Sequence, residues 1–299
     1  MNWQFFIEVL VSGLLAGVMY SLVALGFVLI YKASGVFNFA QGAMVFLAAL
    51  TFVSLVERGM NFPLAFGITL AVMIVLGIGI ERMVLRPLVN QPQIALFMAT
   101  IGLTFVLEGL SQLVWDSQPH GLDLGIPDVP IPWLADKANI LISQFDLFAA
   151  AVAAILVAVL AVFFQTTRIG RALRAVADDH QAALAVGIPL RQIWAIVWSV
   201  AGFVALVAGL MWGARNGVQY ALTFIALKAL PVLILGGFES VSGAIVGGLI
   251  IGASEKLAEV YLGPYVGGGL ESWFPYVLAL AFLLVRPEGL FGEKRIERI

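Results

Sequence analysis

The sequence contains no cysteine and only two histidines among its 299 residues. The missing cysteine excludes disulfides, thiolate catalysis and cysteine-ligated metals. Charged residues make up 11% of the chain, whereas a soluble domain has about 25%. Because so few charges could not cover a water-facing surface, the chain is predicted to be an integral membrane protein. Its net charge of −2 provides no basic surface for a nucleic acid partner.

Enzymatic motifs are also missing from the sequence. There is no H-E-x-x-H, no G-x-S-x-G and no G-x-x-x-x-G-K-[ST] phosphate-binding loop. In the topology predicted below, His120 and His180 lie on opposite sides of the membrane, so they cannot share a metal ion. We therefore predict no catalytic residue, no metal site and no cofactor bound by this chain. Any energy for its activity comes from another chain or an ion gradient.

The sequence is rich in long apolar runs. A membrane-spanning helix needs about 20 mostly apolar residues. Runs near this length predict an all-α, polytopic helical bundle in the lipid bilayer, with eight to ten spans. The nine runs are 5–30, 40–56, 62–81, 93–114, 146–165, 193–213, 221–238, 240–262 and 270–286.

The distribution of lysine and arginine predicts the orientation, because cytoplasmic loops carry an excess of both. With the N-terminus outside, the basic loop 166–192 and the C-terminus are cytoplasmic, and the acidic loop 115–145 is external. No basic residue precedes the first apolar run, so we expect a retained helix there rather than a signal peptide. Residues 1–299 are predicted to form a single transmembrane domain.

Loop 166–192 predicts an amphipathic helix followed by a break. Gly187 tolerates a left-handed backbone and Pro189 disfavours helix at the residue before it, so the helix must stop there and a new one can begin. Arg174 and Asp178 are four residues apart and can pair. The unit either lies in the lipid interface or docks a soluble partner. Residues at helical spacing near one face are Leu173, Val176, Ala177, His180, Leu184 and Ile188.

The segment 34–46, SGVFNFAQGAMVF, interrupts two apolar runs with polar residues and glycine. One interpretation is a cytoplasmic turn with Asn38 and Gln41 in water. The other is an unwound segment inside the protein that lines a transport pathway, since broken helices are tolerated at membrane depth beside a cavity.

Lys228 lies within an apolar run, three residues before Pro231. A charge inside a membrane is by default functional. Its partner is either an acidic residue or a carbonyl freed by Pro231, unless the side chain snorkels to water. Glu8 and Glu108 are expected at the membrane interface. A solvated face is expected for Glu255, Lys256 and Glu259.

Small residues four apart let membrane helices approach closely. Such pairs predict packing either within the chain or against a partner subunit. The pairs are Gly243 with Gly247, and Gly248 with Gly252.

Several segments, in order, carry a resemblance to a known family. The loop motif QAALAVGI has the A-A-x-x-x-G spacing of Ala182, Ala183 and Gly187, with Gln181 where that motif usually has Glu. The chain resembles the LivH-type permeases of branched-chain amino acid ATP-binding-cassette (ABC) importers over essentially its whole length. The other segments are GLLAGVMYSLVALGFVLIYKASGVFNFAQGA (13–43), RPL (86–88), ATIGL (99–103), RIGRALRAVADD (168–179), IALKALPVLILGGFESVSGAIVGGLIIG (225–252) and RPEGLFG (286–292).

The resemblance implies a permease subunit in a bacterial inner membrane that moves branched-chain or other small, mostly hydrophobic amino acids. It implies a LivM-like second permease subunit, two ATPase subunits that bind ATP and Mg, and a periplasmic binding protein that sets most of the specificity. The implied ATPase-coupling residues are Arg171, Arg174, Asp178, Gln181, Ala182, Ala183, Gly187 and Pro189. The implied pathway residues are Asn38, Phe39, Gln41, Gly42 and Lys228.

Two alternatives stay open on the sequence alone. Urea, short amides or aromatic acids are substrates of similar permeases, and no residue here excludes them. An ion-coupled secondary transporter or channel is a different class, and it needs carboxylates or histidines at mid-membrane. The residues available for that role are Glu8, Glu108 and Lys228, mostly near the ends of their spans.

Overall fold

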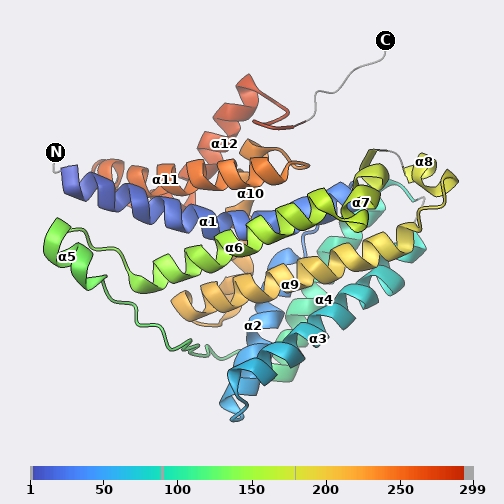
Figure 1. Ribbon diagram of the computed structural model, residues 1–299, viewed down its shortest axis with the longest axis horizontal. Helices are drawn as coiled ribbons and strands as arrows, with labels where there is room; N and C mark the ends of the chain where they lie inside the picture. The colour runs from blue at the N-terminus through green and yellow to red at the C-terminus, as the bar shows by residue number, and fades with distance from the viewer. Residues whose placement is uncertain (1–2, 89–90, 179, 293–299) are drawn as a thin grey trace. The chain divides into compact units, whose positions relative to one another are not determined.

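The computed structural model describes residues 3–88, 91–178 and 180–292. Within these ranges the chain folds into helices (Figure 1). Extended backbone segments pair at two isolated β-bridges. The all-α class predicted from the apolar runs is confirmed. The α-helices are α1 Trp3–Ser34, α2 Gln41–Glu57, α3 Phe62–Ile80, α4 Gln93–Trp115, α5 Pro132–Ala138, α6 Gln144–Thr166, α7 Arg168–Asp178, α8 His180–Ala185, α9 Leu190–Asn216, α10 Ile225–Gly236, α11 Val241–Val266 and α12 Phe274–Val285.

Short irregular helices join some of these elements. A π-helical turn, η1 (Glu81–Leu85), and a 3₁₀ turn, η2 (Arg86–Leu88), extend α3. The 3₁₀ turns η3 (Tyr220–Phe224) and η4 (Leu270–Ser272) precede α10 and α12. Loop 115–145 contains the seven-residue helix α5.

Six of the described helices are long and apolar enough to cross a membrane: α1, α3 with its extension, α4, α6, α9 and α11. Three shorter apolar segments, Gln41–Glu57, Tyr220–Gly236 and Phe274–Val285, complete the series. Together they match the nine predicted runs in order, so the protein is a multi-pass membrane protein. At about 1.5 Å per residue α10 is only about 18 Å long, which is shorter than a hydrocarbon core of about 30 Å.

The chain divides into two compact units. The first contains residues 1–24, 125–158 and 227–299, and the second contains 25–124 and 159–226. Three of the unit boundaries fall inside helices α1, α6 and α10.

In the second unit, α2 is the central helix. It packs against α3, α4, α9 and η3. All its residues from Gln41 to Val53 are buried, as expected for a helix that is apolar on every side. Helices α3 and α9 also pack closely, because a Cβ on Gly77 would lie only 2.8 Å from the backbone nitrogen of Ser199.

In the first unit, the N-terminal part of α1 lies along α11 (Figure 1). Gly13 and Gly17 of α1 face Gly248 and Gly252 of α11. A Cβ on Gly248 would lie 2.6 Å from the carbonyl oxygen of Gly17. Lipid tails are as apolar as the side chains, so the hydrophobic effect does not drive membrane helices together. Close backbone approach of this kind stabilises their packing through van der Waals contact instead.

Candidate functional sites

The break predicted at Gly187–Pro189, within loop 166–192, is present. Gly187 has a left-handed φ of 83°, and α9 begins at Leu190 with Pro189 as its N-cap residue. Upstream, the unit consists of two helices, α7 and α8, and both contact α9. We call α7, α8 and the turn 186–189 the coupling unit.

One side of the coupling unit is anchored in the protein and the other is exposed. Leu173, Val176 and Ala183 are buried, whereas Leu184 is 54% and Val186 is 76% exposed. The spacing predicts Leu184 near the same face as Leu173, and the protein covers Leu173 but leaves Leu184 exposed.

Two arginines of α7 hold the end of α6. The Arg174 guanidinium donates to the carbonyl oxygens of Phe164, at 2.7 Å, and Gln165, at 3.3 Å. Arg171 donates to the carbonyl of Thr166 at 3.0 Å. The last carbonyls of a helix lack intrahelical donors and carry partial negative charge, so these contacts stabilise the α6 terminus. Such bonds give both arginines an anchoring role, in addition to any contact with a partner.

The predicted pair between Arg174 and Asp178 is not described, because the Asp178 side chain lies outside the described residues. The same holds for the side chains of His180 and Gln181, and for Asp179. Ala182, next to this group, is exposed.

The segment between α1 and α2 is unwound inside the protein. Asn38 and Gln41 are both 0% exposed, so the interpretation as a solvated turn is wrong. Asn38 Oδ1 accepts from the Ala40 N–H at 3.1 Å, and Asn38 Nδ2 donates to Gln41 Oε1 at 3.3 Å. These bonds replace the helical hydrogen bonds that the break removes.

Neighbouring helices satisfy carbonyls freed by the break. Trp194 Nε1 of α9 donates to the Ala33 carbonyl at 2.9 Å. The Thr100 hydroxyl of α4 donates to the Phe37 carbonyl at 3.1 Å. Because no water is available at membrane depth, a broken helix needs such partners. Around it, Phe37 stacks on Phe27 at 4.7 Å between ring centroids, and Phe39 meets Phe97 edge-on at 4.9 Å.

A second break lies against the first. After α9 the chain turns at Gly217, with φ of 76°, into η3. Gly42, at the start of α2, faces Thr223 of η3 so closely that a Cβ would overlap its carbonyl oxygen. Two interruptions of helical backbone therefore meet beside the buried Asn38 and Gln41.

Glu108 is buried on α4, where its carboxylate accepts from the Tyr220 hydroxyl at 3.2 Å. Tyr220 of η3 thus contacts Glu108, and the expectation of an interfacial Glu108 stays a prediction. Glu8 is only partly exposed and accepts from the Leu141 N–H at 3.0 Å.

Lys228 has an acidic partner. Its ammonium lies 3.3 Å from Glu255 Oε1 of α11, and the same oxygen accepts from the Tyr20 hydroxyl of α1 at 3.1 Å. Glu255 is 2% exposed and Lys228 is 36% exposed. The prediction of a solvated Glu255 is therefore wrong. Its neighbour Lys256 pairs with Glu271 at 2.7 Å.

Glu255 was detectable from spacing. It follows Gly248 by seven residues and Gly252 by three, so it shares their face of the helix. Because that face packs on α1, the Glu255 carboxylate is buried in the same contact. Tyr20, Thr100 and Trp194 have no comparable signal in the sequence, because each is an ordinary residue of an apolar run.

The four predicted packing glycines make their contacts within the chain. Gly248 and Gly252 pack on α1, and Gly243 and Gly247 pack on α10. A Cβ on Gly247 would lie 2.6 Å from the Val232 carbonyl oxygen. These close contacts leave the same glycine faces no room for a helix of another subunit.

His120, in the part of loop 115–145 that belongs to the second unit, contacts α2 and the segment before η3. Its backbone pairs with Val218, and its Nδ1 lies 3.0 Å from Glu57 Oε1. The side-chain hydrogen bond to Glu57 raises the pKa of His120, although partial burial opposes the shift. In the described part of the chain, no three His, Asp or Glu side chains form a group that could hold a metal ion.

The chain has helices long enough to span a membrane, a buried break between two helices, and an anchored helical unit with one exposed apolar side. These features fit a polytopic membrane transport protein. The family model described as "Branched-chain amino acid transport system / permease component" matches residues 9–286. The chain belongs to this family, whose members are permease subunits of ABC importers and not enzymes.

Curated relatives match the chain from end to end. The permease protein BraD of a high-affinity branched-chain amino acid transport system from Pseudomonas aeruginosa is 28% identical, over 98% of each chain. LivH of Escherichia coli K12, with the same description, is 28% identical over 100% of this chain and 99% of its own. A probable branched-chain amino acid permease, LivH of Methanocaldococcus jannaschii, is 28% identical over 93% and 90%.

Proposed function

We propose that this chain is the permease subunit of an importer for branched-chain or other small, mostly hydrophobic amino acids in a bacterial inner membrane. A binding protein delivers the substrate to the external face, and two ATPases that hold ATP and Mg drive its passage. A LivM-like permease is the second membrane subunit. The N-terminus lies outside and the C-terminus in the cytoplasm, which puts the coupling unit on the ATPase side.

The exposed apolar side of the coupling unit carries this proposal. Leu184 and Val186 project from a unit whose other side is anchored by Leu173, Val176 and the two arginines. In a polar loop, a helix that is anchored to the protein on one side and exposes apolar residues on the other suits docking of a protein. Ala182 and Gly187, which fit the family's loop motif, flank these residues and permit close approach. The lipid interface is the competing location for the same apolar surface.

The pathway is proposed at the two meeting breaks. Asn38, Gln41 and Gly42 on one break and η3 on the other provide the polar backbone and amide groups that an apolar bundle otherwise lacks. Transporters commonly bind substrate where discontinuous helices meet. An amino acid needs partners for its carboxylate and ammonium groups, and a small apolar side chain suits the aromatic rings around Asn38.

The docking proposal is tested by copurification of the importer subunits. Leu184→Asp with Val186→Asp is expected to release the ATPases from the permease, because the charges would be buried at the contact. Leu113→Asp is the matched control, since Leu113 is an exposed apolar residue on α4, away from the coupling unit. Deletion of 178–189 is expected to release the ATPases completely. ATPases that stay bound to both variants would contradict the docking role.

A further inference from the structure

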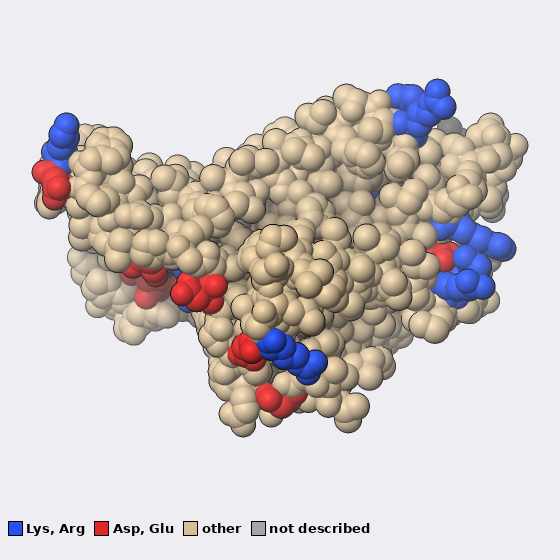
Figure 2. Space-filling model, turned by 60° about the horizontal axis from the view of Figure 1, so that its bottom comes forward, with Lys and Arg blue, Asp and Glu red and all other residues tan. Residues whose placement is uncertain are grey.

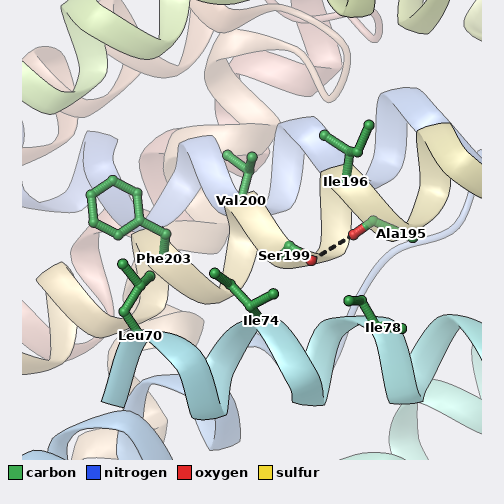
Figure 3. A pocket seen from close by; sticks show the side chains of 8 residues that line it. All are labelled: Leu70, Ile74, Ile78, Ala195, Ile196, Ser199, Val200 and Phe203. Atoms are coloured by element: carbon green, nitrogen blue, oxygen red, sulfur yellow. Dashed lines mark hydrogen bonds between the residues drawn. The ribbon is translucent and has the colours of Figure 1, made fainter. Parts of the chain in front are cut away.

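An apolar groove follows the seam between α3 and α9 in the second unit (Figure 3). The two helices run antiparallel, since Gly77 approaches Ser199 and Gly202 approaches Met73. Side chains on both sides of the seam then leave a hollow on the outer surface. The lining residues are Leu70, Ile74 and Ile78 from α3, and Ala195, Ile196, Ser199, Val200 and Phe203 from α9.

The groove offers no polar group to a solute. Its one hydroxyl, on Ser199, donates to the Ala195 carbonyl of its own helix at 2.7 Å, as Figure 3 shows. A zwitterionic substrate would lose its water there without gaining partners. A hydrocarbon chain loses nothing, so the groove suits an apolar ligand.

Two cations lie one turn beyond the same end of the groove. Arg191 precedes Ala195 by four residues, so it continues the groove face of α9. Arg82 lies in the π-helical turn η1 that extends α3 beyond Ile78. Because η1 packs against α9, both arginines lie beyond the end of the groove formed by Ile78 and Ala195.

Both arginines are available for an anion. Both are exposed, and neither makes a hydrogen bond or ion pair with the residues that the structure describes. The carboxylate adjacent to Arg82, that of Glu81, is taken by Arg86 through two bonds of 3.2 and 3.0 Å. Figure 2 shows that Lys and Arg side chains occur in a few small groups, separated by broad uncharged surface.

We propose that the α3–α9 groove binds an acyl chain of an anionic phospholipid and that Arg82 and Arg191 bind its phosphate. Basic residues at the membrane surface beside a hydrophobic slot match both parts of such a lipid. A helix of another subunit is the competing occupant, because Ala195 and Ser199 are small residues four apart on α9. The two arginines favour the lipid, since an apolar helix offers them no anion.

The bound lipid would affect the position of the coupling unit. Arg191 is the second residue of α9 and follows directly on the turn at Gly187–Pro189. A phosphate shared with Arg82 would hold the first turn of α9 to the end of α3. The groove would then fix the place from which α8 projects.

Native mass spectrometry of the full, purified chain tests the site, with dioleoyl phosphatidylglycerol and dioleoyl phosphatidylcholine as probes. The wild type is expected to retain phosphatidylglycerol preferentially. Arg82→Gln with Arg191→Gln should weaken its binding roughly 30-fold, because each arginine near a membrane anion contributes roughly fivefold. Arg58→Gln, at an exposed arginine of the α2 end, is the control and should leave binding unchanged.

Further variants separate the lipid from other ligands. Ala195→Trp fills the groove and should reduce retention of phosphatidylglycerol while both arginines remain. If the double variant does not fold, each single arginine variant should weaken binding roughly fivefold. Unchanged preference for phosphatidylglycerol in the arginine variants would overturn the proposal. Equal competition by glycerol 3-phosphate would overturn the role of the acyl chain.

A partner helix in the groove gives a distinct result. Because the chain has no cysteine, Ile74→Cys supplies a single thiol inside the groove. The proposal predicts no disulfide between this thiol and cysteines introduced along the spans of the second permease subunit. An efficient disulfide in the assembled importer would show that a helix occupies the groove, and would overturn the lipid site.

Discussion

The ammonium of Lys228 and the carboxylate of Glu255 lie 3.3 Å apart, on the half-length helix α10 and on α11. The two groups are not equally buried, since Glu255 is 2% and Lys228 is 36% exposed. The Tyr20 hydroxyl donates to the same carboxylate from α1. Three helices of the first unit therefore meet at one buried anion, and Lys228 neutralises it.

This asymmetry predicts the effect of removing each partner. Lys228→Met leaves the buried carboxyl of Glu255 without its cation, and should lower the free energy of unfolding by about 3 kcal/mol. Glu255→Gln leaves a cation that reaches solvent, and should cost about 1 kcal/mol. Thermal unfolding of the purified variants measures the difference. Equal losses would mean that burial of Glu255 does not determine the energetics of the pair.

The double variant Lys228→Met with Glu255→Met provides the control. Replacing both charges removes the stranded anion, so stability should recover to near the wild-type value. If uptake stays low in this stable variant, the charges themselves serve transport. If uptake also recovers, the pair is structural and Lys228 is not one of the pathway residues that the family resemblance implies.

Substitution of Asn38, in the break between α1 and α2, is expected to impair transport without impairing folding. Asn38→Leu removes the donor to Gln41 and the acceptor for Ala40, and places a methyl group where the substrate would find an amide. Uptake should be abolished while expression and association with the ATPases persist. Normal uptake by this variant would contradict a pathway at the break.

Asn61→Leu is the matched control for that experiment. Asn61 is an exposed N-cap residue whose side chain accepts from the Leu64 N–H at 3.1 Å. Its loss should cost about 1 kcal/mol of stability and leave uptake unchanged. The comparison separates loss of a helix-capping asparagine from loss of a pathway amide.

The contact of α1 with α11 predicts high sensitivity at Gly248. Gly248→Ala places a methyl group against the Gly17 carbonyl and the Ser21 hydroxyl, and should lower the free energy of unfolding by about 1–3 kcal/mol. Gly102→Ala on α4, where a Cβ would meet no atom within 4 Å, should be neutral or slightly stabilising. Thermal unfolding of both variants side by side tests this contrast.

The His120–Glu57 contact predicts that pH affects the attachment of loop 115–145. The pKa of His120 is raised from 6.5 by its hydrogen bond to Glu57, with Asp116 adding to the shift. The contact therefore contributes fully below pH 6.5 and is lost as the pH rises through the raised value. Limited proteolysis should cut the loop faster at pH 8 than at pH 6. His120→Gln should remove that difference, and its persistence would place the pH effect elsewhere.

The long elements could be predicted from the sequence, because hydropathy reports burial in lipid directly. All nine apolar runs correspond to helical segments, and the Gly187–Pro189 break stands where backbone geometry requires it. The environment of single polar residues could not be predicted in this way. Asn38 and Glu108 are buried because η3 and the neighbouring helices cover them, and no local pattern encodes that tertiary contact.

Leu184 shows a related limit of periodicity. The helical spacing predicts that Leu173 and Leu184 lie near one face, but Leu173 is buried and Leu184 is exposed. Periodicity predicts which residues share a face, whereas the packing of other helices determines which part of that face is covered. The exposure of Leu184 supports the docking proposal.

Uptake of radiolabelled leucine into proteoliposomes tests the central claim most directly. The permease is reconstituted with its second subunit, the ATPases and the binding protein. Leucine should accumulate only when all components and Mg-ATP are present, and vesicles with this chain alone should not take it up under a proton or sodium gradient. Accumulation by the chain alone would contradict the account and identify an ion-coupled transporter or channel.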